Sequence, residues 1–127
     1  MNKFTIAALL VLSGCVSTGT KIDYASPQNY KLDSKAIKIT GQLLTPYKHN
    51  EFTGSIVYSR QLIVSFDDKP VIDGYLSAPK AIQGELTGNY QGKKVSSICN
   101  SVQTNETNIK VDCMVLIDNE RTVTLTF

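Results

Sequence analysis

The residues of this chain with the widest range of chemistry are three cysteines, Cys15, Cys99 and Cys113, and a single histidine, His49. Thiolates can act as nucleophiles, bind metals or form disulfides. The sequence has no CxxC or HxxxH pair, so a tetrahedral metal site would have too few ligands. We therefore expect no metal and no other cofactor, and we interpret His49, which follows Pro46 in a polar stretch, as an exposed loop residue.

Carboxylates form the next candidate group. Asp67, Asp68 and Asp73 could be imagined as calcium ligands or as a carboxylate pair. Aspartates in a turn that contains proline are more typical of turn formers, because their side chains bond to the nearby backbone. We therefore interpret Asp67-Asp68-Lys69-Pro70 as a turn between two strands.

Glycines recur at every fourth position, at Gly84, Gly88 and Gly92. A phosphate-binding loop needs such glycines between a strand and a helix, and no helical pattern follows them. Kinks or bulges in a strand are the better interpretation. No serine has the glycine-flanked context of a nucleophile elbow either. We predict that the protein is not an enzyme.

The first fifteen residues form a separate unit. Met1-Asn2-Lys3 is charged, Phe4–Leu12 is almost continuously apolar, and small residues lead to Cys15. This order is typical of a signal peptide. The apolar run is about half of the roughly 20 residues that a helix needs to cross a bilayer. An ordinary secretory signal, with Cys15 present by chance, is the alternative.

Leu12-Ser13-Gly14-Cys15 resembles the lipobox of bacterial lipoproteins. The resemblance implies a signal peptide of residues 1–14, cleavage before Cys15, and acylation of its sulfur and its new amino group. Two or more chains, such as palmitate, make membrane attachment stable. Val16 and Ser17 follow the cysteine instead of aspartate, which by the same resemblance implies the outer membrane, with its periplasmic face expected.

The charge balance limits the possible partners. The formal net charge is +2, and lysine and arginine never form a run. Nucleic-acid binding needs a basic patch, so we exclude that class. The membrane, reached through the lipid, and a protein of the cell envelope are the expected partners.

Cys99 and Cys113 form an even pair in an exported domain, which predicts a disulfide. Two buried free thiols are the alternative. The most polar stretch of the domain, residues 104–108, lies midway between them. A hairpin with that loop places the cysteines directly opposite each other, at a non-hydrogen-bonded pair where the side chains are closest.

The remaining chain divides into a tether and a domain. Residues 15–35 have no sustained apolar period, so we predict a lipidated N-terminus and a flexible tether. Tyr24 and Tyr30 could instead pin this segment to the domain. Residues 36–127 alternate short β-prone runs with turn signals. The predicted fold class is all-β, a small antiparallel β-sandwich or barrel of about seven or eight strands.

The C-terminal third predicts a three-stranded meander stapled by the disulfide. Residues 109–117 and 121–127 both carry their apolar side chains at odd positions. Opposite residues in an antiparallel pair share a face, so the loop must hold an odd number of residues. We predict a three-residue loop, Asp118–Glu120, with Val115 opposite Val123.

With catalysis, metal binding and nucleic-acid binding set aside, the expected function is binding through the protein surface. The candidates are Tyr47, His49 and Phe52 in one loop, and Tyr90 and Lys93 around another, because exposed aromatics beside basic residues are typical of hot spots. The alternative is that Tyr90 packs in the core and the lysine is solvated. We expect an outer-membrane-anchored, non-enzymatic protein-binding or assembly module. The alternative is a periplasmic inhibitor or immunity lipoprotein against a hydrolase or toxin.

Overall fold

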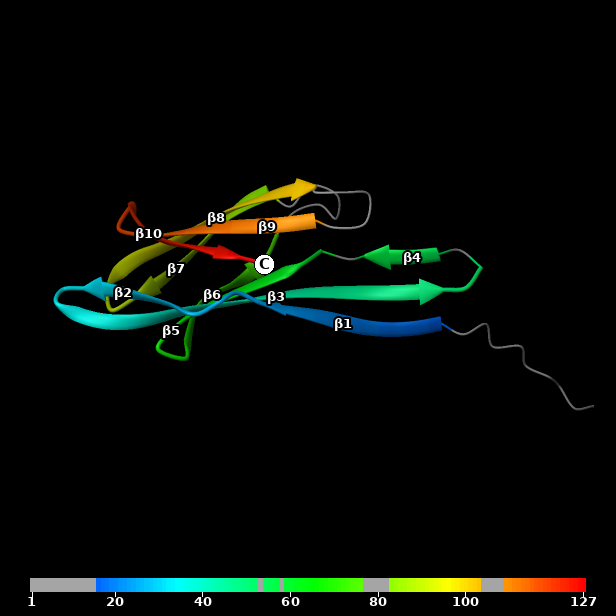
Figure 1. Ribbon diagram of the computed structural model, residues 1–127, viewed down its shortest axis with the longest axis horizontal. Coiled ribbons are helices and arrows are strands. Elements are labelled where there is room, and N and C mark those ends of the chain that lie inside the picture. The colour runs from blue at the N-terminus through cyan, green and yellow to red at the C-terminus, as the bar shows by residue number, and fades with distance from the viewer. Residues whose placement is uncertain (1–15, 53, 58, 77–82, 104–108) are drawn as a thin grey trace, which may run out of the picture.

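The fold is built from β-strands alone in the residues that the computed structural model describes, which are 16–127 except 53, 58, 77–82 and 104–108. The predicted signal peptide and Cys15 lie outside these residues. Ten strands form two antiparallel sheets (Figure 1). Their bounds are β1 Val16–Tyr24, β2 Gln28–Leu32, β3 Lys35–Asn50, β4 Gly54–Val57, β5 Gln61–Phe66, β6 Lys69–Tyr75, β7 Gln83–Tyr90, β8 Lys93–Gln103, β9 Ile109–Ile117 and β10 Glu120–Thr126.

The two sheets pack into a β-sandwich, which confirms the predicted fold class. The first sheet has the order β1-β3-β5-β6, with β2 and β4 also paired to β3, and the second has the order β10-β9-β8-β7. Alternate residues of each strand point inward, and each buried aliphatic or aromatic side chain contributes about 1.5–3 kcal/mol. The core includes Ile37, Ile39, Leu43, Leu62, Val64, Phe66 and Ile72 from the first sheet and Val95, Cys99, Val111, Cys113, Val115, Ile117, Val123 and Leu125 from the second.

The prediction of a flexible tether over residues 15–35 is wrong for its described part, because β1 and β2 lie along one edge of β3. β2 pairs with residues 35–39 and β1 with residues 42–50, so the two strands and β3 form one long hairpin. Between them Ala25 is buried, and its N–H donates to the carbonyl oxygen of Gly41 at 3.1 Å. These two strands account for the difference between the expected seven or eight strands and the observed ten.

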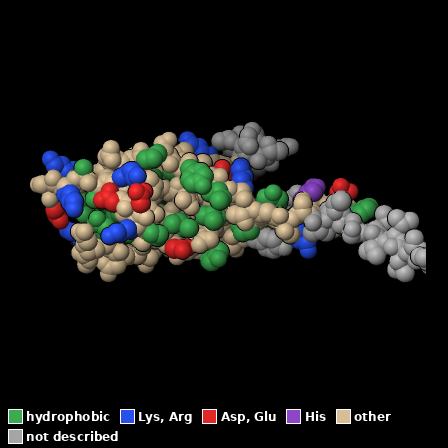
Figure 2. All heavy atoms as spheres, turned by 90° about the horizontal axis from the view of Figure 1, so that it is seen from below, with side chains coloured by type: hydrophobic (Ala, Val, Ile, Leu, Met, Phe, Trp, Pro, Cys, Tyr) green, Lys and Arg blue, Asp and Glu red, His purple; other side chains and the backbone are tan. Residues whose placement is uncertain are grey.

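A narrow three-stranded extension, here called the arm, projects beyond the sandwich (Figure 1, right). It consists of residues 16–20 of β1, 46–50 of β3 and β4, with β3 in the middle. Val16 pairs with Asn50 at its tip, where the chain turns through Glu51 and Phe52. Figure 2 shows the same extension beside the thicker sandwich, and charged side chains gather toward the opposite end.

That opposite end, here called the turn end, carries two-residue hairpin turns that connect β2–β3, β5–β6, β7–β8 and β9–β10. Both residues of each turn have positive φ, between 47° and 78°, which matches the type I′ turns that suit the twist of a hairpin. Aspartate and asparagine tolerate this conformation better than most residues. The turns are Asp33-Ser34, Asp67-Asp68, Gln91-Gly92 and Asp118-Asn119.

The last hairpin corrects the predicted three-residue loop. The loop holds two residues, with Ile117 paired to Glu120, and the register shifts by one between Arg121 and Thr124. A β-bulge there inserts the extra residue that parity requires. Beyond it the pairing of Leu125 with Cys113 belongs to the predicted register. The predicted odd-numbered loop is therefore wrong, and the bulge in β10 provides the one-residue shift that the loop was expected to provide.

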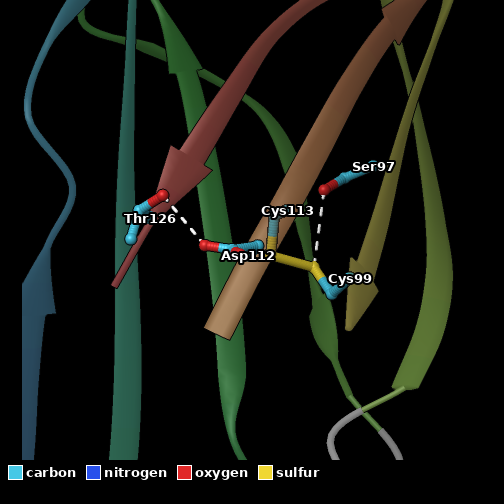
Figure 3. The surroundings of a disulfide bond; sticks show 5 residues. All are labelled: Ser97, Cys99, Asp112, Cys113 and Thr126. Atoms are coloured by element: carbon cyan, nitrogen blue, oxygen red, sulfur yellow. Dashed lines mark hydrogen bonds between the residues drawn. A yellow bond between two sulfur atoms is a disulfide. The ribbon is translucent and has the colours of Figure 1, made fainter. Parts of the chain in front are cut away.

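The predicted disulfide is confirmed, and it staples the meander β8-β9-β10. Cys99 and Cys113 are paired directly across β8 and β9, and their Cα atoms lie 4.0 Å apart (Figure 3). So short a distance is typical of a non-hydrogen-bonded pair, as expected. The Ser97 hydroxyl donates to the Cys99 sulfur at 3.6 Å, because a disulfide sulfur carries no hydrogen. Closing a loop of this length stabilises the fold by about 3 kcal/mol.

Gly88 has a packing role instead of the predicted kink or bulge. The pairing of β7 with β8 is regular through Gly84 and Gly88, so neither forms a bulge. A Cβ atom at Gly88 would overlap the carbonyl oxygen of Val71 in β6, where the two sheets meet. A Cβ atom at Gly84 would lie 3.6 Å from the nearest side-chain atom, an ordinary contact.

These two glycines provide a matched test of the packing. We expect Gly88→Ala to lower the free energy of unfolding by about 3 kcal/mol, because the backbone of β6 must move to make room. Gly84→Ala should stay within about 1 kcal/mol of the parent protein, since the site has space and a strand interior gains from losing a glycine. Urea denaturation measures both values, and equal losses in the two variants would contradict this account.

Candidate functional site

The structure places the residues singled out from the sequence at two opposite ends. Tyr47, His49 and Phe52 lie on the arm, whereas Tyr90 and Lys93 flank a turn of the turn end. Since β3 runs from one end to the other over sixteen residues, these ends are separated by about 50 Å. The two groups therefore cannot form one site.

Tyr90 follows the alternative interpretation, in which it packs on the core. Its ring meets Phe66 edge-to-face, with centroids 5.0 Å apart and planes at 71°. Such pairs add about 0.5–1.5 kcal/mol beyond the area that they bury. The rest of Tyr90 lines a surface depression of about 390 Å³ beside Lys35 and Lys69.

Lys93 belongs to a set of charges that cross-link the turns. Its ammonium lies 3.3 Å from the Asp33 carboxylate on the β2–β3 turn, and Lys38 lies 3.2 Å from Asp68 on the β5–β6 turn. Because these groups are largely exposed, each pair contributes about 0–1 kcal/mol.

Two aspartates of the turn end tie each turn to a third strand. Asp67 Oδ1 accepts a hydrogen bond from the Lys38 N–H at 2.8 Å, while the Asp67 N–H donates to the Lys38 carbonyl oxygen. Asp118 does the same with Lys94 in the second sheet, at 3.0 Å. The predicted turn over Asp67-Asp68-Lys69-Pro70 is confirmed for Asp67 and Asp68, whereas Lys69 and Pro70 belong to β6. No group of three metal-binding side chains gathers in the part of the chain that the structure describes.

The aromatic residues of the arm differ in their surroundings. Tyr47 pairs with Gly19 and lays its ring over that residue, where a side chain would collide with the phenol. His49 lies between Ser17 and Ser55 of the neighbouring strands, so it belongs to a strand and not to the predicted loop. Phe52 occupies the turn, and 84% of its surface is exposed.

Arg60 lies where the sandwich continues into the arm. Its guanidinium Nε donates to the Thr45 hydroxyl at 3.1 Å. Burial lowers the pKa of Arg60 from its ordinary value, and the nearby Asp23 carboxylate raises it in part. An arginine remains charged at neutral pH despite such a shift, so this group anchors polar contacts and does not exchange protons.

The outer face of the first sheet carries an apolar surface that the sequence analysis did not identify, here called the outer patch. Ile22, Leu44 and Tyr75 lie in one row across β1, β3 and β6, and Tyr24 and Ile63 lie in the next. Tyr24 and Tyr75 are each 67% exposed. Their polar neighbours on this face are Gln42, Gln61 and Asp73, and Gln61 Nε2 donates to Asp73 Oδ1 at 2.6 Å.

A sequence signal for the outer patch did exist. Strand residues alternate between two faces, so consecutive apolar residues such as Leu43-Leu44 and Leu62-Ile63-Val64 must leave one member outside the core. Two of the other contributors, Ile22 and Tyr24, lie in the segment interpreted as a tether. Their place on the sheet could not be recognised before β1 was known to pair with β3.

Comparisons with models of protein families, with curated proteins and with solved structures find no match to this chain. The described residues include no helix of the length and hydrophobicity that a bilayer crossing requires.

The Asp67 contact yields a prediction about the turn end. Asp67→Ala should lower the free energy of unfolding by about 1–2 kcal/mol, because it removes the bond to Lys38 and places alanine at a φ of 47°. Asp67→Asn keeps an oxygen acceptor and tolerates positive φ. Its free energy of unfolding should therefore fall by less than about half of the loss in Asp67→Ala. Urea unfolding of the two variants tests this, and equal stabilities would show that the side-chain bond contributes nothing.

Proposed function

We propose that the protein is a lipoprotein anchored in the outer membrane through Cys15, and that its β-sandwich is a non-enzymatic module that binds a protein of the cell envelope. The lipobox-like sequence Leu12–Cys15 supports the anchor. The outer patch supports the binding function and is the observation that carries it.

The composition of the outer patch fits a protein partner. Two exposed tyrosines, with aliphatic and glutamine side chains alternating between them, are the kind of surface found in protein interfaces, where tyrosine is enriched. The patch lies on strands that the core holds in place, so its side chains need little ordering when a partner binds. The polar residues Gln42, Gln61 and Asp73 provide hydrogen-bonding groups beside it.

The non-enzymatic part of the proposal rests on where the single histidine lies. His49 is on the arm, between two serine-bearing strands, far from the depression beside Tyr90. The arm also bears on the alternative of an inhibitor or immunity protein. Its reactive loop would be Tyr47–Phe52, which lies at the same end as Val16 and hence beside the proposed lipid.

The anchor is tested at Cys15. Protein purified from its native host should begin at Cys15 and carry acyl chains in mass spectrometry of the N-terminal peptide. It should also enter the detergent phase in Triton X-114 partitioning, because each buried CH₂ contributes about 0.8 kcal/mol. Cys15→Ser should lack the acyl mass and stay in the aqueous phase. A different first residue, or an unmodified thiol at Cys15, would refute the anchor.

The binding face is tested at Tyr24 and Tyr75. A partner recovered with the intact lipoprotein from detergent-solubilised envelopes should bind Tyr24→Ala or Tyr75→Ala about tenfold more weakly, as expected for a hot-spot tyrosine. Since both side chains are exposed, the free energy of unfolding should change by less than about 0.5 kcal/mol.

Val102 offers a matched control, because it is an exposed apolar residue on β8 of the other sheet. Val102→Ala should leave binding unchanged. Equal affinity of the parent protein and both tyrosine variants would refute the outer patch as the binding face, and recovery of lipid alone would refute a protein partner.

A further inference from the structure

The tip of the arm brings the proposed anchor and an exposed aromatic residue to the same place. Val16 pairs with Asn50, and Phe52 follows Asn50 by two residues in the turn. Residue 15 is covalently bonded to Val16, so its Cα lies within about 4 Å of the Cα of Val16. A lipid on Cys15 would therefore enter the membrane beside Phe52.

Phe52 is exposed although the turn around it is ordered by hydrogen bonding. Its backbone N–H donates to Asn50 Oδ1 at 2.9 Å, while 84% of its surface remains open to solvent. Polar residues of the arm, including Ser17, Thr18 and Lys48, lie on the strands that lead to this turn. Because so much of the ring is exposed, the described part of the fold does not cover it.

The arm also removes the flexible spacer between lipid and domain. The last buried residue of β3 is Thr45, and the five residues from there to Asn50 span about 17 Å in a paired strand. β1 and β4 flank this part of β3, so three strands and not one chain connect the tip to the sandwich. A three-stranded ribbon transmits orientation, whereas a flexible chain does not.

We infer that the tip of the arm is a second membrane contact, in which Phe52 inserts at the boundary between phospholipid headgroups and acyl chains beside the lipid on Cys15. The inference rests on the proposed anchor. Glu51 in the turn and Lys48 on the adjoining end of β3 carry opposite charges and remain among the headgroups, which limits the depth of insertion. With two contacts at its tip, the arm holds the sandwich away from the membrane and directs the turn end outward.

The chain contains no tryptophan, so one introduced indole reports on a single position. The acylated lipoprotein carrying Phe52→Trp is reconstituted into vesicles of phosphatidylethanolamine and phosphatidylglycerol with brominated acyl chains. We expect its emission to shift to shorter wavelength and to be quenched by bromine relative to unbrominated vesicles. Tyr24→Trp is the matched control, because Tyr24 is also exposed but lies about 26 Å along β1 from Val16.

Mass spectrometry of the same samples separates the two possible failures. If Cys15 is acylated and Phe52→Trp shows the emission of a hydrated indole, with no more quenching than Tyr24→Trp, the membrane contact is refuted and the anchor stands. That result would leave the tip free for a protein partner. If Cys15 carries no lipid, the anchor is refuted and the inference is refuted with it.

Discussion

Backbone hydrogen bonding along both edges of β3 is the constraint on which the rest of the structure depends. One edge of this strand holds β2 and β1 in succession, and the other holds β5 and β4. The half of β3 near the turn end also buries Ile37, Ile39 and Leu43 in the core. The other half leaves the core and becomes the middle of the arm. One continuous strand thus joins the packed part of the molecule to its extension.

Different interactions stabilise the two ends of the molecule, the turn end and the arm. At the turn end, tight turns with positive φ are tied to neighbouring strands by Asp67 and Asp118 and cross-linked by exposed ion pairs. At the arm, backbone pairing of β1, β3 and β4 joins the strands, and the ring of Tyr47 lies over Gly19. Between them the disulfide of Cys99 and Cys113 secures the second sheet. The turn end is therefore cross-linked by side chains, whereas the arm is a narrow ribbon of three paired strands.

Much of the fold could be predicted because strands with one buried face alternate apolar and polar residues. That pattern predicted β9, β10 and residues 37–43 of β3, and counting outward from a polar loop placed Cys99 opposite Cys113. The apolar residues of β9 and β10 all fall at odd positions, so one extra residue is needed near the last turn to keep them on the same face. A longer loop and a β-bulge both supply that residue, so the sequence could not choose between them. β1 was missed because its pairing uses the backbone of Thr, Ser and Gly residues, which leave no apolar period.

The candidate site was less predictable for a related reason. Aromatic residues near Tyr47 and Tyr90 were visible in the sequence, but their roles depend on which strands run beside them. The outer patch unites Ile22 and Tyr24 with residues of three other strands, and only the register of β1 brings them together. Local patterns identify what each strand buries, whereas a surface shared by several strands depends on long-range pairing.

The long hairpin of β2, β1 and β3 has a consequence for how the protein folds. Its turn at Asp33-Ser34 joins neighbours in sequence, so pairing can start there and proceed toward Val16, whose partner Asn50 is the most distant in the chain. Because a chain is synthesised from its N-terminus, the segment of β1 is present before the end of β3 has followed. Segments rich in Thr, Ser and Gly aggregate less readily than apolar strands during such a wait. The same polar composition that leaves this strand without an apolar period thus protects the newly made chain until its partner strand is present.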